Sequence, residues 1–324
     1  MINQIVKDIP SETFEPVEAI IEGLDYFRGL SKAGLSNLSK DEFEKLKETA
    51  NKFFNVNVAF FADVYPTKLF RITNNKYLRN GKSQKLQKIS ELIGPPPAVS
   101  RYNRCNLPGE SVFYAALDLK TAIWETQPGE HDYVTVSEWK IKEGQRLNAH
   151  AIFHPEMVNI NRDSQHALES YLQARKGMSK DKAQAFHEIF KFLTEEFMKP
   201  VKSLEDYYFS SFLSSRLLQG PPDDNGFRID AITYPSVKME YGLTNLAILN
   251  SVVLEKLDLV SIKLWSVAET NYGKGDLSAE DMIKISSLVY EVKDFDFEKD
   301  RIIYDSKEEL RLVVEMLKKK GELG

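Results

Sequence analysis

Residues 112–126 read Val-Phe-Tyr-Ala-Ala-Leu-Asp-Leu-Lys-Thr-Ala-Ile-Trp-Glu-Thr and contain the main indications of the fold. The opening Val-Phe-Tyr-Ala favours a β-strand, because aliphatic and aromatic side chains with strand preference follow one another. Asp118 can accept a hydrogen bond from the first turn of a helix, which predicts a short helix from Leu119 to Thr126. The apolar residues of that helix would form its buried stripe, and Glu125 lies at the edge of the stripe. This segment therefore predicts a strand followed directly by a helix that ends in a carboxylate.

The segments on either side predict an α+β fold with three parts. Residues 1–64 read as helical, and Ser39 with Glu42 has the spacing of a capping box. Residues 65–270 alternate strands and turns, with clean alternation over Tyr133–Ile141, and are interrupted by a helical insertion at about 162–219. Residues 271–324 are predicted to be a helical extension, because Ser278 and Ser306 can each cap a helix.

Composition places the chain among ordinary globular proteins. Its 324 residues are 42% hydrophobic and 28% charged, and the formal net charge is −5, which gives no global reason to expect nucleic-acid binding. Cys105 is the only cysteine, so an intrachain disulfide and a thiolate zinc cluster are excluded. The N-terminus lacks the apolar segment of a secretory signal, and no stretch is apolar enough to span a membrane. We therefore expect a soluble cytoplasmic protein with no membrane partner.

Residues 68–88 contain a disproportionately large share of the positively charged residues. Seven Lys and Arg residues occur there, from Lys68 to Lys88, and no acid occurs before Glu91. The ordinary interpretation is a solvated face. The alternative is a local positive field for an anionic ligand, which a chain of negative net charge can still contain. Direct nucleic-acid binding by this stretch is a remote third interpretation, and it would show a steep salt dependence.

Common catalytic motifs are absent from the sequence. Gly273-Lys-Gly275 lacks the strand, helix and third glycine of a dinucleotide fingerprint, and no phosphate loop or nucleophile elbow occurs. His187-Glu188 begins like a zinc-protease helix, but Lys191 stands where the second histidine belongs. His150 and His154 lie four residues apart at an expected strand end, which is poor spacing for a metal site. We predict no metal site, and Cys105 in its basic loop is interpreted as incidental.

Five residues with complementary chemistry stand in short local motifs. Arg71 lies in an apolar strand, Arg101 follows a triple-proline turn, and Tyr114 lies in the strand before the Glu125 helix; Ser236 follows Pro235 in a Tyr-Pro-Ser turn. Taken singly, each has a more ordinary structural explanation. Together they suit NAD, because guanidinium groups hold phosphates and an aromatic ring can stack on a cationic ring. A fixed carboxylate can stabilise the charge that develops when the nicotinamide–ribose bond breaks.

The residues of these motifs and their order along the chain resemble the RES domain family. The resemblance runs from Arg71 through Arg101-Tyr102-Asn103 to Tyr114-Ala115-Ala116 and Glu125, and continues with Tyr234-Pro235-Ser236 ahead of Gly242 and Asn245. It covers roughly residues 68–267. Ala98-Val99-Ser100 stands where the family usually has glycines, and the chain is longer than the compact members of the family.

The resemblance implies an ADP-ribosyltransferase-like fold: a split mixed or antiparallel β-core flanked by helices. It implies that Glu125, Arg71 and Ser236 are catalytic, and that Arg101, Tyr114, Asn245 and, in reserve, Arg104 bind NAD. NAD would be the substrate and no resident cofactor is expected.

The same resemblance implies a toxin of a toxin–antitoxin system, inhibited by a small antitoxin protein. We expect an NAD glycohydrolase or phosphorylase. The alternatives are an ADP-ribosyltransferase with a protein acceptor, and a nucleotide-binding regulatory module without turnover. The sequence does not decide among water, phosphate and protein as the acceptor.

Overall fold

The computed structural model describes residues 17–54, 61–64, 68–75, 85–156, 162–222, 226–236, 244–273 and 277–305. The chain forms two compact units, each assembled from segments that are distant in sequence. Unit 1 comprises residues 1–64, 96–111 and 147–237, and unit 2 comprises residues 65–95, 112–146 and 238–324. Helices and β-strands occur in both units, which confirms the predicted α+β class. One change of unit falls between residues 64 and 65, and residues 65–270 are divided between the two units, because the insertion and the N-terminal helices share unit 1.

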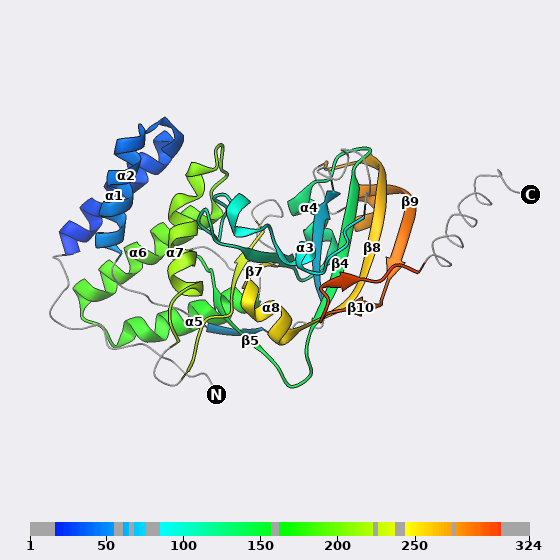
Figure 1. Ribbon diagram of the computed structural model, residues 1–324. Helices are drawn as coiled ribbons and strands as arrows, with labels where there is room; N and C mark the ends of the chain where they lie inside the picture. The colour runs from blue at the N-terminus through cyan, green and yellow to red at the C-terminus, as the bar shows by residue number, and fades with distance from the viewer. Residues whose placement is uncertain are drawn as a thin grey trace, which may run out of the picture. The chain divides into compact units, whose positions relative to one another are not determined.

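Unit 1 is mainly helical (Figure 1). Its strands β1 and β5 are antiparallel and β5 and β6 are parallel, so the β-core of the chain is mixed. The elements of unit 1 are α1 (Val17–Ala33), η1 (Leu35–Asn37), α2 (Lys40–Phe53), β1 (Phe61–Val64), η3 (Pro97–Val99), β5 (Leu147–Ala151), α5 (Arg162–Lys176), α6 (Lys180–Met198), η4 (Glu205–Tyr207), α7 (Tyr208–Leu218) and β6 (Ala231–Pro235).

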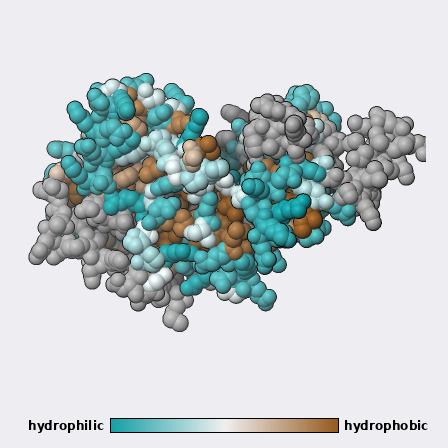
Figure 2. Space-filling model, in the orientation of Figure 1, coloured by the Kyte–Doolittle hydropathy of each residue, from teal (hydrophilic) through white to brown (hydrophobic). Residues whose placement is uncertain are grey.

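The N-terminal helices and the insertion share one hydrophobic core. Phe27 on α1 is 1% exposed and contacts aromatic rings of α2 and its C-cap, of α6 and of α7. The predicted capping box at Ser39 and Glu42 is confirmed, since each side chain accepts the backbone N–H of the other. The part of the α1 and α2 surface visible in Figure 2 is largely hydrophilic, as expected for the solvent-facing side of amphipathic helices.

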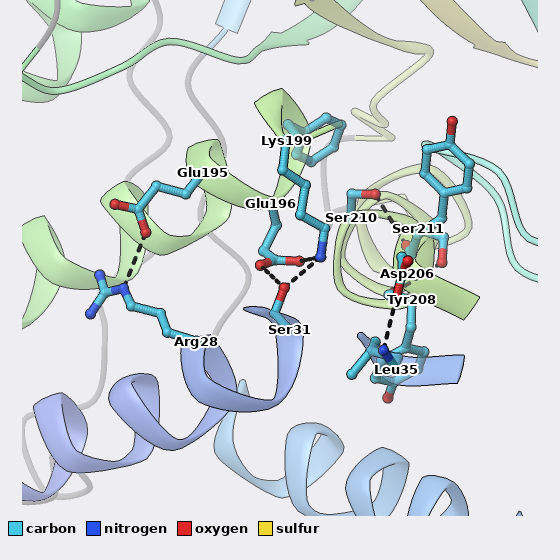
Figure 3. A network of polar contacts seen from close by, with 12 residues as sticks. Arg28, Ser31, Leu35, Glu195, Glu196, Lys199, Asp206, Tyr208, Ser210 and Ser211 are labelled. Carbon is cyan, nitrogen blue, oxygen red and sulfur yellow. Dashed lines mark hydrogen bonds and ion pairs between the residues drawn. The ribbon is translucent and has the colours of Figure 1, made fainter. Parts of the chain in front are cut away.

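Polar contacts fix α1 and the turn after it to the insertion (Figure 3). The Arg28 side chain donates to Glu195 over 3.1 Å. The Ser31 hydroxyl donates to the buried Glu196 over 2.6 Å, and Lys199 contacts both of these residues. After α1, the backbone N–H of Leu35 donates to Asp206 over 2.8 Å. The N-terminal helices are therefore an integral part of unit 1.

Glu156, which follows β5, joins the insertion through charged hydrogen bonds. Its carboxylate lies 2.8 Å from Lys191 Nζ and 3.0 Å from His187 Nε2, and these two bonds lower the pKa of Glu156 to about 2. A carboxyl whose pKa falls on folding stabilises the fold above its unfolded pKa of 4.5, and this contribution is lost as pH falls towards about 2. The group is largely exposed, so the contribution is screened by solvent.

We expect Glu156→Gln to lower stability at pH 7 by less than about 1 kcal/mol. The difference from the wild type should shrink as the pH falls from about 4.5 towards 2, because the wild-type carboxyl becomes protonated in that range. Urea unfolding of both proteins at pH 7 and at pH 3 measures the effect. Glu169→Gln is the control, since this exposed residue of α5 makes none of these bonds. A stability difference independent of pH would contradict the assignment.

Unit 2 is built on an antiparallel sheet with the strand order β7-β3-β2-β4-β8-β9. The predicted strand over Tyr133–Ile141 and the predicted helix over Leu119–Thr126 are both confirmed at these bounds. The elements are β2 (Leu69–Asn74), α3 (Ser90–Ile93), β3 (Val112–Ala116), α4 (Leu119–Thr126), β4 (Tyr133–Ile141), β7 (Thr244–Leu249), α8 (Asn250–Lys256), β8 (Leu257–Thr270), α9 (Ala279–Met282), β9 (Ile283–Val292), β10 (Phe295–Asp296) and β11 (Arg301–Ile302).

The sheet of unit 2 is divided between β2 and β3. β2 pairs with β4 along its whole length, and β3 pairs with β7 along its whole length. Between β2 and β3, the only register pair in the described residues is Phe70 with Ala116. The strands therefore diverge on either side of this pair, which agrees with the split β-core implied by the family resemblance.

The prediction of a helical C-terminal extension is wrong for residues 277–305. The capping box of Ser278 and Asp281 starts a helix as predicted, but α9 ends after four residues. β9 begins at Ile283 and pairs with β8, and the short strands β10 and β11 follow. Apolar residues at alternate positions, Ile283 and Ile285, favour a strand, and pairing with the long β8 outweighs the local helix signal. The predicted cap at Ser306 lies outside the described residues.

Candidate active site

Glu125 is held on α4 at the split in the sheet. The Asp118 side chain caps α4 by accepting the backbone N–H of Thr121 over 2.8 Å. Ala122 and Ile123 are buried against the sheet, in a cluster that includes Ile72 of β2 and Ala116 of β3. α4 therefore covers both sides of the split, and the helix geometry leaves Glu125 half-buried at the edge of its packed face.

Asn245 on β7 binds the Glu125 side chain. Its Nδ2 donates to Glu125 Oε1 over 2.9 Å, and the Asn245 side chain is itself buried. Asn245 pairs with Ala116 in the ladder, and Tyr114 lies two residues before Ala116 on the same face of β3. The structure therefore brings three of the predicted site residues to one face of the unit 2 sheet: Tyr114, Glu125 and Asn245.

Arg71 lies at the split but on the other face of the sheet. Phe70 pairs with Ala116, so the alternation of side chains along β2 directs Arg71 away from the α4 face. Its guanidinium lies 5.4 Å from the ring centre of Phe113, and its Nη1 donates to the backbone carbonyl of Tyr114 over 2.9 Å. Arg71 is half-buried and bridges the diverging strands through this bond. The sequence predicted Arg71 as a site residue but did not predict this face.

Arg101 belongs to unit 1 and lies in a loop organised by Asn106. Asn106 is buried, and its side chain donates to the backbone carbonyl of Arg101 over 2.8 Å. It also contacts the Ser100 hydroxyl. Glu110 in this loop accepts from Ser215 of α7 over 2.5 Å. Sequence reasoning missed Asn106 and Glu110; the Asn-Leu-Pro-Gly turn beginning at position 106 was the available signal.

The absence of the usual glycines before Arg101 causes no backbone strain. None of residues 98–100 has a positive φ, and Ser100 is extended with φ −67° and ψ 137°. Any residue adopts such a conformation, so Ala98, Val99 and Ser100 are compatible with the observed loop.

Arg104 and Ser236 also belong to unit 1. The Arg104 guanidinium donates to the carbonyl of Phe197 at the end of α6 and lies 5.3 Å from the ring centre of Tyr207. Arg104 therefore ties its loop to the insertion. Ser236 follows β6 and is fully buried, in contrast to an ordinary exposed turn residue. The predicted roles of Arg101, Arg104 and Ser236 in NAD binding and catalysis stay predictions.

Cys105 lies in the core of unit 1. Its side chain is fully buried, and burial raises the pKa of the thiol to about 12. A thiol with this pKa is protonated at neutral pH and is a weak nucleophile.

We expect the native protein not to react with Ellman's reagent at pH 8, because the thiol is both buried and protonated. The same protein unfolded in guanidinium should release one equivalent of thionitrobenzoate, since the chain has one cysteine. The absorbance change at 412 nm measures both reactions. Rapid stoichiometric labelling of the native protein would contradict this description.

The basic stretch is partly engaged within unit 2. Lys68 lies 2.8 Å from Glu138, and Lys85 lies 4.7 and 4.3 Å from the ring centres of Tyr290 and Tyr304. Lys76, Arg79 and Lys82 lie outside the described residues. Within the described ranges, no three His, Cys, Asp or Glu residues are grouped in a way that could hold a metal ion.

The family model of the RES domain matches residues 68–265, which is more than half of the chain and contains all seven predicted site residues. This family is associated with NAD-related toxin–antitoxin systems. No curated protein matches the chain. Among the helices of the described segments, none has both the length and the apolar character needed to cross a membrane.

Proposed function

The chain belongs to the RES domain family, and from this premise we propose that it cleaves the bond between the nicotinamide and the ribose of NAD. Family membership indicates an NAD-utilising enzymatic role. The specific reaction that we propose is hydrolysis, with NAD as substrate and no resident cofactor. The hydrogen bond between Asn245 and Glu125 supports this proposal most directly, because it holds one carboxylate oxygen in a defined position.

A fixed carboxylate can stabilise the positive charge that develops on the ribose in this reaction. When the C–N bond to nicotinamide breaks, its electron pair leaves with the nicotinamide nitrogen and positive charge develops on the ribose. The Glu125 carboxylate stabilises that charge and accepts hydrogen bonds from ribose hydroxyls. A water oxygen then bonds to the ribose carbon and loses a proton, which yields ADP-ribose and nicotinamide. Asn245 keeps Glu125 oriented throughout.

Tyr114 and Arg71 contribute to substrate binding in this proposal. The Tyr114 ring shares the sheet face of Asn245 and stacks on the cationic nicotinamide ring. Arg71 acts from the opposite face of the sheet, where its guanidinium stabilises the diverging β3 backbone at Tyr114. We assign phosphate binding to Arg101, with Arg104 as a reserve candidate, and the Ser236 hydroxyl orients the ribose or the nicotinamide.

Nicotinamide release from NAD by the purified protein tests the proposal, with and without inorganic phosphate. Release that needs no phosphate supports hydrolysis, whereas release that requires phosphate identifies a phosphorylase. ADP-ribosylation of an added protein, seen as a mass increase, identifies a transferase. NAD binding without any of these reactions would indicate a binding module, and the absence of NAD binding would overturn the proposal.

The association of the family with toxin–antitoxin systems supports a role for this chain in such a system. We propose that the chain is a toxin that depletes NAD and that a small antitoxin protein inhibits it. Induced expression in a bacterial host should then lower cellular NAD and stop growth, and the Glu125→Gln variant should do neither. Growth arrest by both forms, with cellular NAD unchanged, would count against this setting.

A further inference from the structure

The connection between β8 and β9 lies against the helix that carries Glu125. It runs from Asn271 to Met282, beyond the matched residues 68–265, and residues 271–273 and 277–282 of it are described. Its ends are joined, because the backbone N–H of Asn271 donates to the carbonyl of Met282 over 2.8 Å. This connection is therefore a defined part of unit 2 that the family match does not include.

Apolar packing joins the connection to α4. Met282 at the end of α9 is fully buried in the same cluster as Ala122 and Ile123 of α4. Leu277 and Ala279 pack against that cluster from the same connection. The α4 helix thus has the sheet on one side and the β8–β9 connection as a second apolar neighbour.

Tyr272 makes a polar contact with the turn after α4. Its hydroxyl donates to the backbone carbonyl of Pro128 over 2.6 Å. Its ring meets the ring of Trp124 edge-on, with centres 6.0 Å apart and planes at 79°. Trp124 precedes Glu125 in the chain, and Pro128 follows it by three residues. Tyr272 therefore contacts the chain on both sides of Glu125.

The turn that Tyr272 contacts is otherwise held by Asp132. The Asp132 carboxylate accepts the backbone N–H of Gly129 over 2.8 Å and the side-chain amide of Asn74 over 2.7 Å. Gln127, the C-cap of α4, has the left-handed φ of 43°. A non-glycine residue in that conformation requires support from its surroundings. The hydroxyl of Tyr272 supplies such support at the next residue.

We infer that Tyr272 is a positioning residue for Glu125, and that the β8–β9 connection acts on the reaction through the end of α4. The inference rests on the proposed function, since it assigns Tyr272 to the catalytic carboxylate. Displacement of a catalytic group by a fraction of an ångström lowers the rate of the chemical step without weakening the binding of distant parts of the substrate. Loss of the Tyr272 hydroxyl should therefore lower kcat more than it changes KM.

Tyr272→Phe tests the inference because it removes only the hydroxyl. Tyr304→Phe is a matched control: the Tyr304 hydroxyl donates to the carbonyl of Leu86 over 2.7 Å, in the same unit but away from α4. We expect Tyr272→Phe to lower kcat for NAD about tenfold with KM within about twofold. Hydrogen exchange of the Gln127 amide should become faster, whereas Tyr304→Phe should leave both quantities unchanged.

The remaining outcomes overturn the inference in distinguishable ways. An active wild type with unchanged kcat in Tyr272→Phe would overturn the role of Tyr272 and leave the proposed function intact. Equal losses of kcat in the two variants would indicate a general structural effect and would also overturn the role of Tyr272. A lower kcat with unchanged exchange at Gln127 would exclude the route through α4. A wild type that does not consume NAD would overturn the proposed function together with the inference.

Discussion

Glu125→Gln should lower nicotinamide release from NAD by about 100-fold or more, the scale of losing one electrostatic contact to a transition state. Glutamine has nearly the same shape as glutamate and keeps a side-chain oxygen that accepts the Asn245 hydrogen bond. The variant therefore removes the negative charge and leaves the contact with β7 in place. Steady-state rates of nicotinamide release, determined by chromatography, measure the loss. Most of it should appear in kcat, because the charge matters most when the ribose becomes cationic.

Glu130→Gln is the control for this prediction. Glu130 is an exposed residue of the turn after α4, five positions from Glu125, and the same change of charge there should leave the rate unchanged. NAD binding by the Glu125→Gln protein should persist, which separates loss of chemistry from loss of fold. A Glu125→Gln protein with more than about a third of the wild-type rate would remove Glu125 from the mechanism.

Phe27→Ala should lower the free energy of unfolding of unit 1 by about 3–5 kcal/mol, the usual cost of truncating a buried phenylalanine. Phe27 is 1% exposed, and the rings of Phe53, Phe54 and Phe209 lie 5.2 to 5.5 Å from its own. Truncation removes these contacts and leaves a cavity between α1 and the insertion. Urea unfolding followed by circular dichroism at 222 nm measures the change, because most of the helical residues belong to unit 1.

Tyr26→Ala is the matched control, since this neighbouring aromatic side chain is 56% exposed and should cost little. The three tryptophans, Trp124, Trp139 and Trp265, all belong to unit 2, so their fluorescence follows the other unit. Equal losses in Phe27→Ala and Tyr26→Ala would contradict the description of Phe27 as the centre of this core. A shift of the fluorescence transition by the same amount would mean that the two units unfold together.

Local sequence signals predicted the elements that carry the site. Asp118 marked the beginning of α4, and the alternating residues from Tyr133 to Ile141 marked β4 along its full length. Such signals are reliable where the caps and the periodicity of a segment agree with each other. Family resemblance then identified Glu125 and Asn245, which the structure joins by a hydrogen bond.

Other features depend on long-range pairing and were not predictable from local patterns. The face of Arg71 follows from the register of Phe70 with Ala116, and a shift by one residue would have reversed it. The strand β9 was mistaken for part of a helical extension, because its pairing with β8 is not visible in the sequence around Ser278. The contact of Tyr272 with the turn after α4 was not predictable for the same reason, since the two segments are more than 140 residues apart.

The single register pair between β2 and β3 also has a mechanical consequence for unit 2. Main-chain hydrogen bonds make β3 with β7 one stiff block and β2 with β4, β8 and β9 another, and these bonds run along whole strands. The blocks meet at Phe70 and Ala116, at the Arg71 bond and beneath α4. Few main-chain hydrogen bonds cross this line, so the apolar packing of α4 on Ile72 and Ala116 carries much of the connection between the two blocks. The Asn245–Glu125 hydrogen bond adds to this connection, because it joins β7 of one block to the helix that covers both, so the carboxylate is itself part of what holds the two blocks together.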